Sequence, residues 1–254
     1  MISKILKQKH LLFLKEYPKE DIELILDTAF KFREVLDRPI KKVPSLQGVT
    51  IVNLFFENST RTRISFELAQ KRLSADTVNF SASSSSLKKG ESFKDTVQNI
   101  MSMKIDAVVM RHPAPGSPKH LTEFIDAVVV NAGDGAHEHP TQSLADCYTI
   151  TRQLGSVEGK RIVIVGDIKH SRVARSNVKA FSALGAKVAL VAPPTLLPSS
   201  IDNWPVDVIE DFDVAIKEAD VLYLLRMQLE RQEESLVPSL REYTNFYGLT
   251  LDRS

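Results

Sequence analysis

Two kinds of segment alternate along the chain, according to the pattern of its apolar and polar positions. Short apolar runs rich in β-branched residues predict buried strands, and stretches with apolar residues three or four positions apart predict amphipathic helices. Because strands that alternate with helices form parallel sheets, we expect an α/β protein with two doubly wound, mainly parallel-sheet domains joined by a linking helix. The predicted strands lie at residues 49–56, 77–80, 107–110, 128–130, 161–165, 187–191, 206–209 and 221–225.

A polar segment at residues 155–159 separates the two series of strands and helices. The chain has 254 residues, which is enough for two domains with cores of their own. The helical pattern before the polar segment is the physical link between them. We therefore predict a first domain at residues 1–140, a linking helix at 141–155 and a second domain at 156–254.

The stretch IVNLFFENSTRTRISF, residues 51–66, passes from an apolar strand directly into a helix. The junction is STRTR, residues 59–63, and the unpaired N–H groups of the first helical turn face whatever lies beyond the strand. The helix dipole, three hydroxyls and the guanidinium of Arg61 or Arg63 would add to the attraction for a phosphate or carboxylate. The alternative is a serine N-cap followed by two solvated arginines.

The serine-rich segment at residues 81–91 contains Lys88, Lys89 and Gly90 near its end. Its composition is typical of a solvated surface loop or linker. However, it follows a predicted strand and precedes a helix, so it belongs to the same sheet edge as the anion site. A hydroxyl-rich loop that carries lysine is suited to closing over a phosphate.

Cationic and amide side chains follow several of the predicted strands. In open parallel sheets, ligands bind beyond the carboxyl ends of the strands. Core packing does not explain five cations and three other polar side chains at such positions, so we expect a polyanionic substrate in a cleft between the domains. These side chains are Arg61, Lys89, Arg111, His139, Gln142, Arg172, Arg226 and Gln228.

Charge and composition argue against several classes of partner. The formal net charge is +1, so neither nucleic acid nor an anionic membrane is expected as a partner. No apolar run reaches the roughly 18 residues that a membrane helix needs, and the first ten residues lack the features of a signal peptide. We expect a cytoplasmic protein.

No metal, nucleotide or other cofactor is predicted. His137 and His139 lie two positions apart with one carboxylate between them, which is a poor pattern for zinc. The loop after residue 165 lacks a GxGxxG motif, so a dinucleotide is not expected. The single cysteine, Cys147, excludes an intrachain disulfide and is interpreted as a packed thiol.

Six stretches, in the same order, resemble the catalytic subunits of the aspartate carbamoyltransferase family. The STRTR and HPTQ motifs are specific for carbamoyltransferases, and residues 89–91 and 226–228 favour aspartate as the acceptor. The resemblance implies the carbamoyltransferase fold and the transfer of a carbamoyl group from carbamoyl phosphate to L-aspartate, in pyrimidine synthesis. The matching stretches are FFENSTRTRISFE at 55–67, KKGE at 88–91, MRHP at 110–113, NAGDGAHEHPTQSLAD at 131–146, GDIKHSRVARS at 166–176 and LYLLRMQLER at 222–231.

The resemblance also implies roles for individual residues. The phosphate would be bound by Ser59, Thr60, Arg61 and Thr62. The carbamoyl group would be contacted by Arg111, His139 and Gln142, with Arg61 and Thr62 close by. The two carboxylates of aspartate would be bound by Arg172, Arg226 and Gln228.

In this family the serine-rich loop reaches the site of a neighbouring subunit. Lys89 and Ser85 would therefore complete the adjacent site of a homotrimer, and Ser86 is the alternative to Ser85. A regulatory chain or a dihydroorotase would be a further partner of such a trimer.

No nucleophilic side chain with an adjacent base is found among these residues, so we expect the aspartate amine to attack the carbamoyl carbon directly. Hydrogen-bond donors would stabilise the charge that develops on the carbonyl oxygen, and domain closure would align the two substrates. The residues expected to take part in catalysis are Arg61, Thr62, Lys89, Arg111 and His139.

Two alternatives remain open at this stage. An ornithine carbamoyltransferase shares the STRTR motif, but its site would need a carboxylate for the substrate ammonium, whereas Arg172, Arg226 and Lys89 suit a second carboxylate. A catalytically silent relative that binds small anions is the other. One departure from the family favours it: after Arg226 the sequence lacks the His-Pro-x-Pro loop and the C-terminal helix. Such a departure is expected of a shortened chain or of part of a longer one.

Overall fold

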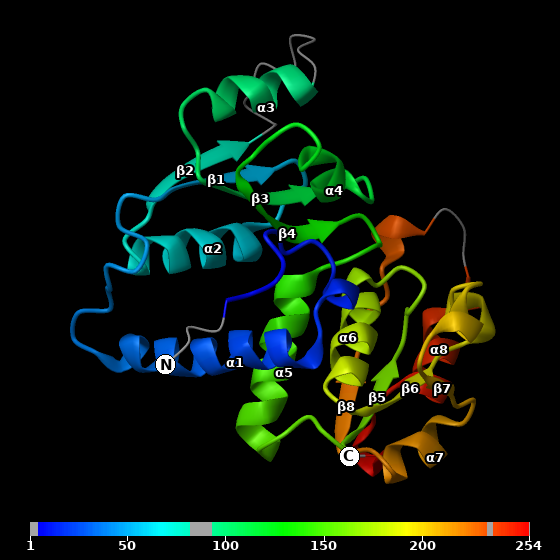
Figure 1. Ribbon diagram of the computed structural model, residues 1–254. Coiled ribbons are helices and arrows are strands. Elements are labelled where there is room, and N and C mark those ends of the chain that lie inside the picture. Colours follow the sequence, from blue (N-terminus) through cyan, green and yellow to red (C-terminus); the bar gives the residue numbers. More distant parts are fainter. Residues whose placement is uncertain (1–4, 82–92, 233–235, 254) are drawn as a thin grey trace. The chain divides into compact units, whose positions relative to one another are not determined.

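Two parallel sheets organise the chain, one in each of two units (Figure 1). The computed structural model describes residues 5–81, 93–232 and 236–253. The first unit is Met1–Gln142 and the second is Ser143–Ser254, so the division falls within the helix α5 (Pro140–Leu154).

The first unit contains four strands. The sheet order is β2-β1-β3-β4 and every pairing is parallel. The strands are β1 (Thr50–Phe55), β2 (Asp76–Ser81), β3 (Ala107–His112) and β4 (Val128–Asp134), and the helices are η1 (Leu14–Glu16), α1 (Lys19–Arg33), η2 (Glu34–Asp37), α2 (Thr60–Arg72), α3 (Phe93–Met101) and α4 (Ser117–Leu121).

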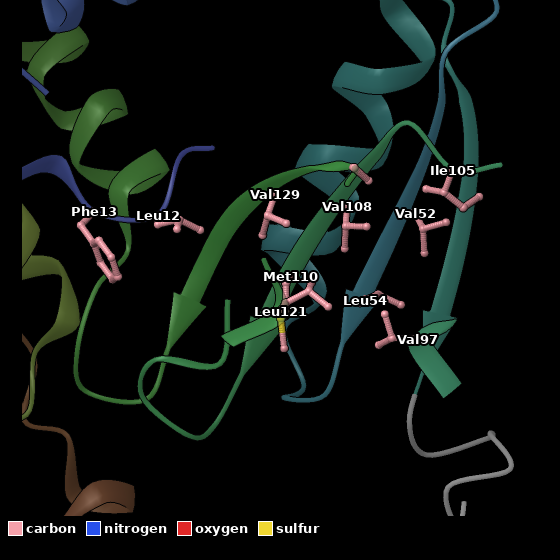
Figure 2. Close-up of a cluster of buried hydrophobic side chains, with 11 residues drawn as sticks. Leu12, Phe13, Val52, Leu54, Val97, Ile105, Val108, Met110, Leu121 and Val129 are labelled. Atoms are coloured by element: carbon pink, nitrogen blue, oxygen red, sulfur yellow. The ribbon is translucent and has the colours of Figure 1, made fainter. Parts of the chain in front are cut away.

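Side chains of β1 alternate between two apolar clusters, because successive strand residues point to opposite faces. Val52 and Leu54 join Val97 of α3 and Leu121 of α4 in the larger cluster (Figure 2). Residues 51 and 55 lie on the other face, where the partly buried Phe66 of α2 packs. Helices therefore cover both faces of this sheet, as expected for a parallel sheet (Figure 1).

The free edge of β4 is covered by the N-terminal segment. Leu11 forms a parallel bridge with Val130, in which its N–H donates to Val129 O at 2.9 Å and its carbonyl accepts from Asn131 N at 2.9 Å. Asn131 also donates its side-chain amide to Leu12 O at 3.2 Å. These bonds satisfy buried polar groups of β4. The strand continues to Asp134, beyond the apolar run from which it was predicted, because Asp134 still pairs with His112 of β3.

The second unit has a sheet of order β7-β6-β5-β8, again with every pairing parallel. One face packs its Val163 and Val165 against Phe212 and Ala215. The strands are β5 (Arg161–Val165), β6 (Lys187–Val191), β7 (Asp207–Val208) and β8 (Val221–Leu224), and the helices are α6 (Arg172–Ala183), η5 (Pro194–Leu196), η6 (Ile201–Asn203), α7 (Phe212–Lys217), η7 (Leu229–Arg231), α8 (Leu240–Tyr247) and η8 (Leu251–Arg253).

A polar contact joins three elements on the other face of this sheet. Tyr223 of β8 donates its hydroxyl to Asp146 of α5 at 2.9 Å, and Asn177 of α6 donates to the same carboxylate oxygen at 3.0 Å. Burial, and then the charge of Asp146, raise the pKa of the Tyr223 hydroxyl. The tyrosine therefore stays a donor, and α5 is tied to the sheet of the second unit.

The predicted fold class is confirmed: both sheets are parallel and alternate with helices. All eight predicted strands are present, with ends that differ by a few residues. The helix α1 ends at Arg33 and is followed directly by the short helix η2. A further helix, α8, follows the last strand, and Leu240, Tyr243 and Tyr247 recur there at helical spacing.

Candidate active site

The N-terminus of α2 lies directly beyond the end of β1. Ser59 is the N-cap residue, with φ −157° and ψ 94°, but its side chain accepts no hydrogen bond from the helix within the described chain. The first bond of the helix ladder is Arg63 N to Ser59 O, at 3.1 Å. The N–H groups of Thr60, Arg61 and Thr62 are therefore left for a group outside the helix, and that arrangement suits an anion.

Arg111 occupies the end of β3, beside this helix terminus. Its register partner in β1 is Phe55, and Phe56 N donates to Arg111 O at 2.9 Å. The guanidinium is buried: Nη2 donates to Glu57 Oε1 at 2.6 Å, and Nη1 donates to Ala132 O at 3.2 Å. Its direction is thus set by the segments that follow β1 and by β4.

The loop that precedes α5 is organised by Asp134, which is fully buried. Its carboxylate accepts from Gly116 N at 2.7 Å, from the Asn131 amide at 3.0 Å and from Glu138 N at 3.0 Å, and His137 Nδ1 lies 3.0 Å away. Burial alone would raise the pKa of Asp134, but these hydrogen bonds outweigh burial and lower it. The ionised carboxylate fixes the entry to α5.

His139 and Gln142 lie at this N-terminus of α5. His139 is buried, and its Nδ1 lies 3.4 Å from the Thr141 hydroxyl, with donor and acceptor set by the ring tautomer. Gln142 N donates to His139 O at 3.1 Å. The carboxyl ends of β1, β3 and β4 are neighbours, so the first unit gathers seven predicted site residues at one sheet edge: Ser59, Thr60, Arg61, Thr62, Arg111, His139 and Gln142. Ser85, its alternative Ser86 and Lys89 lie outside the described residues.

In the second unit, Asp167 joins the loops that follow β5 and β8. The carboxylate is fully buried and accepts from Gln228 N at 3.1 Å and from Gln232 Nε2 at 3.0 Å. It also accepts from His170 N at 3.2 Å, and His170 Nδ1 lies 2.7 Å away. Arg231 donates to His170 O at 2.9 Å. These loops carry the three remaining predicted residues, because Arg172 begins α6 and Arg226 and Gln228 follow β8.

Two of those three residues differ in their surroundings. Arg172 is buried, whereas Arg226 is exposed and forms a two-pronged ion pair with Glu230, with one N–O distance of 2.9 Å. The hydrogen bond from Arg226 lowers the pKa of Glu230 to about 2. Gln228 has a buried side-chain carbonyl oxygen without a hydrogen-bond partner among the described residues.

Sequence reasoning missed the carboxylates that hold these cations and loops. Glu57, Asp134, Asp167 and Glu230 all lie within the motif stretches, close to the predicted residues. The sequence did contain a signal for them, namely an acidic residue near cationic residues after a strand. A buried arginine at such a position needs a carboxylate partner.

The fold and these side chains define a two-unit α/β protein in which each sheet presents arginines and amides beyond its carboxyl edge. Residues 9–152 match the model of the aspartate/ornithine carbamoyltransferase carbamoyl-P binding domain, and residues 158–254 match the Asp/Orn binding domain. The chain belongs to the aspartate/ornithine carbamoyltransferase family.

Individual relatives are aspartate carbamoyltransferases. The catalytic subunit from Thermobifida fusca is 56% identical over 245 residues, which make up 96% of this chain and 78% of that protein. The structure of aspartate transcarbamoylase from Trypanosoma cruzi with carbamoyl phosphate has a TM-score of 0.86 and 33% identity, covering 98% of this chain and 81% of that one. The same enzyme with carbamoyl aspartate and phosphate has a TM-score of 0.83 and 33% identity, covering 90% and 78%.

Neither a membrane-spanning helix nor a metal-ligand cluster occurs among the described residues. None of the helices there combines the length and the apolar composition that crossing a bilayer requires. The same residues contain no group of three or more His, Cys, Asp and Glu side chains that could hold a metal ion.

Proposed function

We propose that this chain transfers the carbamoyl group of carbamoyl phosphate to the amine of L-aspartate, giving N-carbamoyl-L-aspartate and phosphate in de novo pyrimidine biosynthesis. The observation that carries the proposal is the first sheet edge, where the uncapped start of α2 lies beside the buried Arg111. The complexes of the Trypanosoma enzyme with carbamoyl phosphate and with the two products support the same reaction.

Carbamoyl phosphate would bind to the first unit. Its phosphate would accept hydrogen bonds from the first-turn N–H groups of α2 and from the hydroxyls of Ser59, Thr60 and Thr62, and Arg61 would balance its charge. Arg111, His139 and Gln142 would meet the carbamoyl group. The leaving group is thereby held by one helix terminus and the reacting carbonyl by the neighbouring strand end.

The reaction would proceed by direct transfer. The aspartate amine nitrogen attacks the carbamoyl carbon, the bond from that carbon to the phosphate oxygen breaks, and the amine proton passes to the released phosphate. Arg111, His139 and Thr62 would donate to the carbonyl oxygen as its negative charge grows, and each such donor contributes roughly 3 to 4 kcal/mol. Arg61 would stabilise the phosphate as it leaves.

L-Aspartate would bind to the second unit through Arg172, Arg226 and Gln228. Glu230 occupies part of the Arg226 guanidinium, but a guanidinium has five donors, so others remain for a substrate carboxylate. The pair would hold Arg226 in one orientation before the substrate arrives. The buried side-chain carbonyl oxygen of Gln228 would accept a hydrogen bond from a donor group of the substrate.

The remaining parts of the proposal concern assembly and location. We propose a homotrimer in the cytoplasm, with Lys89 and Ser85, or Ser86, reaching the site of the adjacent copy. Residues 1–140 would form the carbamoyl-phosphate-binding domain, 141–155 the linking helix and 156–254 the aspartate-binding domain. A regulatory chain or a dihydroorotase would be a further partner. Sedimentation equilibrium tests the trimer: a mass of three chains is expected, and a monomer would contradict it.

Acceptor choice is tested by supplying carbamoyl phosphate with either L-aspartate or L-ornithine and measuring acceptor-dependent phosphate release. We expect release with aspartate alone, because Arg172 and Arg226 match its second carboxylate. A preference for ornithine would overturn the assignment of the second unit. Silence with both acceptors, from a chain that still binds phosphate, would favour a non-catalytic relative.

A further inference from the structure

Two buried side-chain amides, one from β1 and one from α2, contact each other, and neither is assigned to the active site. Asn53 Nδ2 donates to Gln70 Oε1 at 3.0 Å, and Gln70 Nε2 donates back to Asn53 Oδ1 at 2.8 Å. Their exposed fractions are 0% and 4%. Asn53 lies in the middle of β1, and Gln70 is close to the end of α2, so the two bonds join the strand to the helix.

The contact extends to the neighbouring strand. Asn79 is the register partner of Asn53 in β2, and its Oδ1 accepts the second hydrogen of Asn53 Nδ2 at 2.9 Å. Asn79 in turn hydrogen-bonds to Glu67, which also accepts from Lys71 at 2.6 Å. Glu67 and Gln70 are three positions apart on α2, so one face of the helix contacts two adjacent strands through side-chain hydrogen bonds.

Apolar packing holds α2 to the sheet only weakly. All its residues are described, and Gln70 is the one among them that is buried. Ile64 and Leu68 are 53% and 43% exposed, and Phe66 packs on the sheet while still partly exposed. Apolar contact has no direction, whereas a reciprocal amide pair requires a narrow range of distance and angle. The pair therefore fixes both the rotation of α2 and its position along β1.

We propose that the Asn53–Gln70 pair, with Asn79 and Glu67, is a positioning device for the phosphate-binding start of α2. The pair closes the base of one continuous segment, which runs from β1 through the turn at Ser59 and back along α2. Gln70 lies ten positions after Thr60 along the helix, a rigid span of about 15 Å. A slip or rotation at Gln70 is thus transmitted to the N–H groups and hydroxyls that would hold phosphate. The inference rests on the proposed function, since it assigns that terminus to phosphate.

The test replaces both amides by apolar side chains of similar shape, in the variant Asn53→Leu with Gln70→Met. Removing both partners together leaves no buried amide without its partner, and Asn79 is exposed and can bond to water, so folding is preserved. Calorimetric titration with inorganic phosphate, steady-state kinetics and thermal unfolding are then compared with the parent chain. We expect the dissociation constant of phosphate and the KM for carbamoyl phosphate to rise about tenfold. The KM for aspartate and the unfolding midpoint stay close to the parent values.

Two control variants separate positioning from stability. Tyr17→Phe removes a part-buried hydrogen bond in the same unit, to His10 O, and is expected to lower the unfolding midpoint without changing phosphate affinity. The exchanged pair, Asn53→Gln with Gln70→Asn, restores the reciprocal bonds and should recover most of the lost affinity.

The outcomes distinguish the positioning role of the amide pair from the proposed function. Tight phosphate binding by the parent chain and equally tight binding by the Leu–Met variant would overturn the positioning role and leave the proposed function standing. Weaker binding that follows a fall in stability, without recovery in the exchanged pair, would also overturn it. A parent chain that binds no phosphate would instead contradict the proposed function itself.

Discussion

The guanidinium of Arg111 donates to the carboxylate of Glu57 at 2.6 Å, although the two residues are 54 positions apart in the sequence. Glu57 belongs to the turn between β1 and α2, and Arg111 to the end of β3. The carboxylate thus connects the segment that would hold phosphate with the arginine that would contact the carbamoyl group. Because Arg111 is buried, such a partner is needed to stabilise its positive charge.

Replacing Glu57 should therefore affect both catalysis and stability. We expect Glu57→Gln to lower kcat about tenfold, because the neutral amide no longer fixes Arg111, and to destabilise the fold by about 1–2 kcal/mol. The matched control is Glu123→Gln, which breaks an exposed contact with His120 in the same unit and should change neither value appreciably. Steady-state kinetics and urea unfolding measure the two effects. Identical kinetics in both variants would show that Glu57 does not orient Arg111.

Arg61 is expected to control kcat, because it would contact the leaving phosphate. Arg61→Ala should lower kcat by about 100-fold or more, because it removes charge from the leaving phosphate in the transition state. Arg63→Ala, two positions further along α2, is its control and should have a much smaller effect. Initial-rate measurements at saturating aspartate distinguish them. If the Arg63 variant lost the most activity, the assignment of Arg61 to the phosphate would be wrong and Arg63 would take that role.

Arg226→Ala should chiefly weaken aspartate binding. We expect the KM for aspartate to rise about tenfold or more while the KM for carbamoyl phosphate is unchanged, because the guanidinium would bind a carboxylate throughout the reaction. Kinetics with each substrate varied in turn measure this split. Small and equal effects of Arg61→Ala and Arg226→Ala would contradict the separation between the two units.

The Glu230 carboxylate is expected to preorganise Arg226 rather than to compete with the substrate. Removing its charge in Glu230→Gln should raise the KM for aspartate several-fold, because the exposed arginine must then be ordered when aspartate binds. Since the pKa of Glu230 is about 2, its contribution is present above pH 4.5 and is lost only as the pH falls towards 2. Glu218→Gln, which alters an exposed contact with Arg161, is the control. A lower KM in the Glu230 variant would indicate competition instead.

The Asp134 carboxylate should give the fold a measurable pH dependence. Its pKa is lower in the folded state than the usual 3.8, so its stabilisation is fully present above pH 4 and decreases as the pH falls through the folded-state pKa. Asp134→Asn should therefore cost about 2 kcal/mol at pH 7, and the difference from the parent chain should shrink below pH 4. Urea unfolding at several pH values measures it. A difference that is constant down to pH 3 would rule out this linkage.

Much of the fold and of the first sheet edge could be predicted from the sequence. The apolar runs marked every strand, and STRTR after β1 marked the start of α2, because both signals are local. The partner of a polar residue inside an apolar strand could not be predicted. Asn53 lies in the middle of such a strand, and only the structure places Gln70 opposite it. Glu57 with Arg111 and Asp167 with Gln228 are pairs separated by 54 and 61 positions, which no local pattern encodes.

The most direct test of the proposed reaction is to follow carbamoyl phosphate labelled with ¹³C at the carbamoyl carbon, in the presence of L-aspartate, by NMR. We expect the label to appear in N-carbamoyl-aspartate at the same rate as phosphate is released, because the amine attacks the carbamoyl carbon directly. Release of phosphate with the label in bicarbonate or cyanate, and none in carbamoyl aspartate, would contradict carbamoyl transfer by this chain.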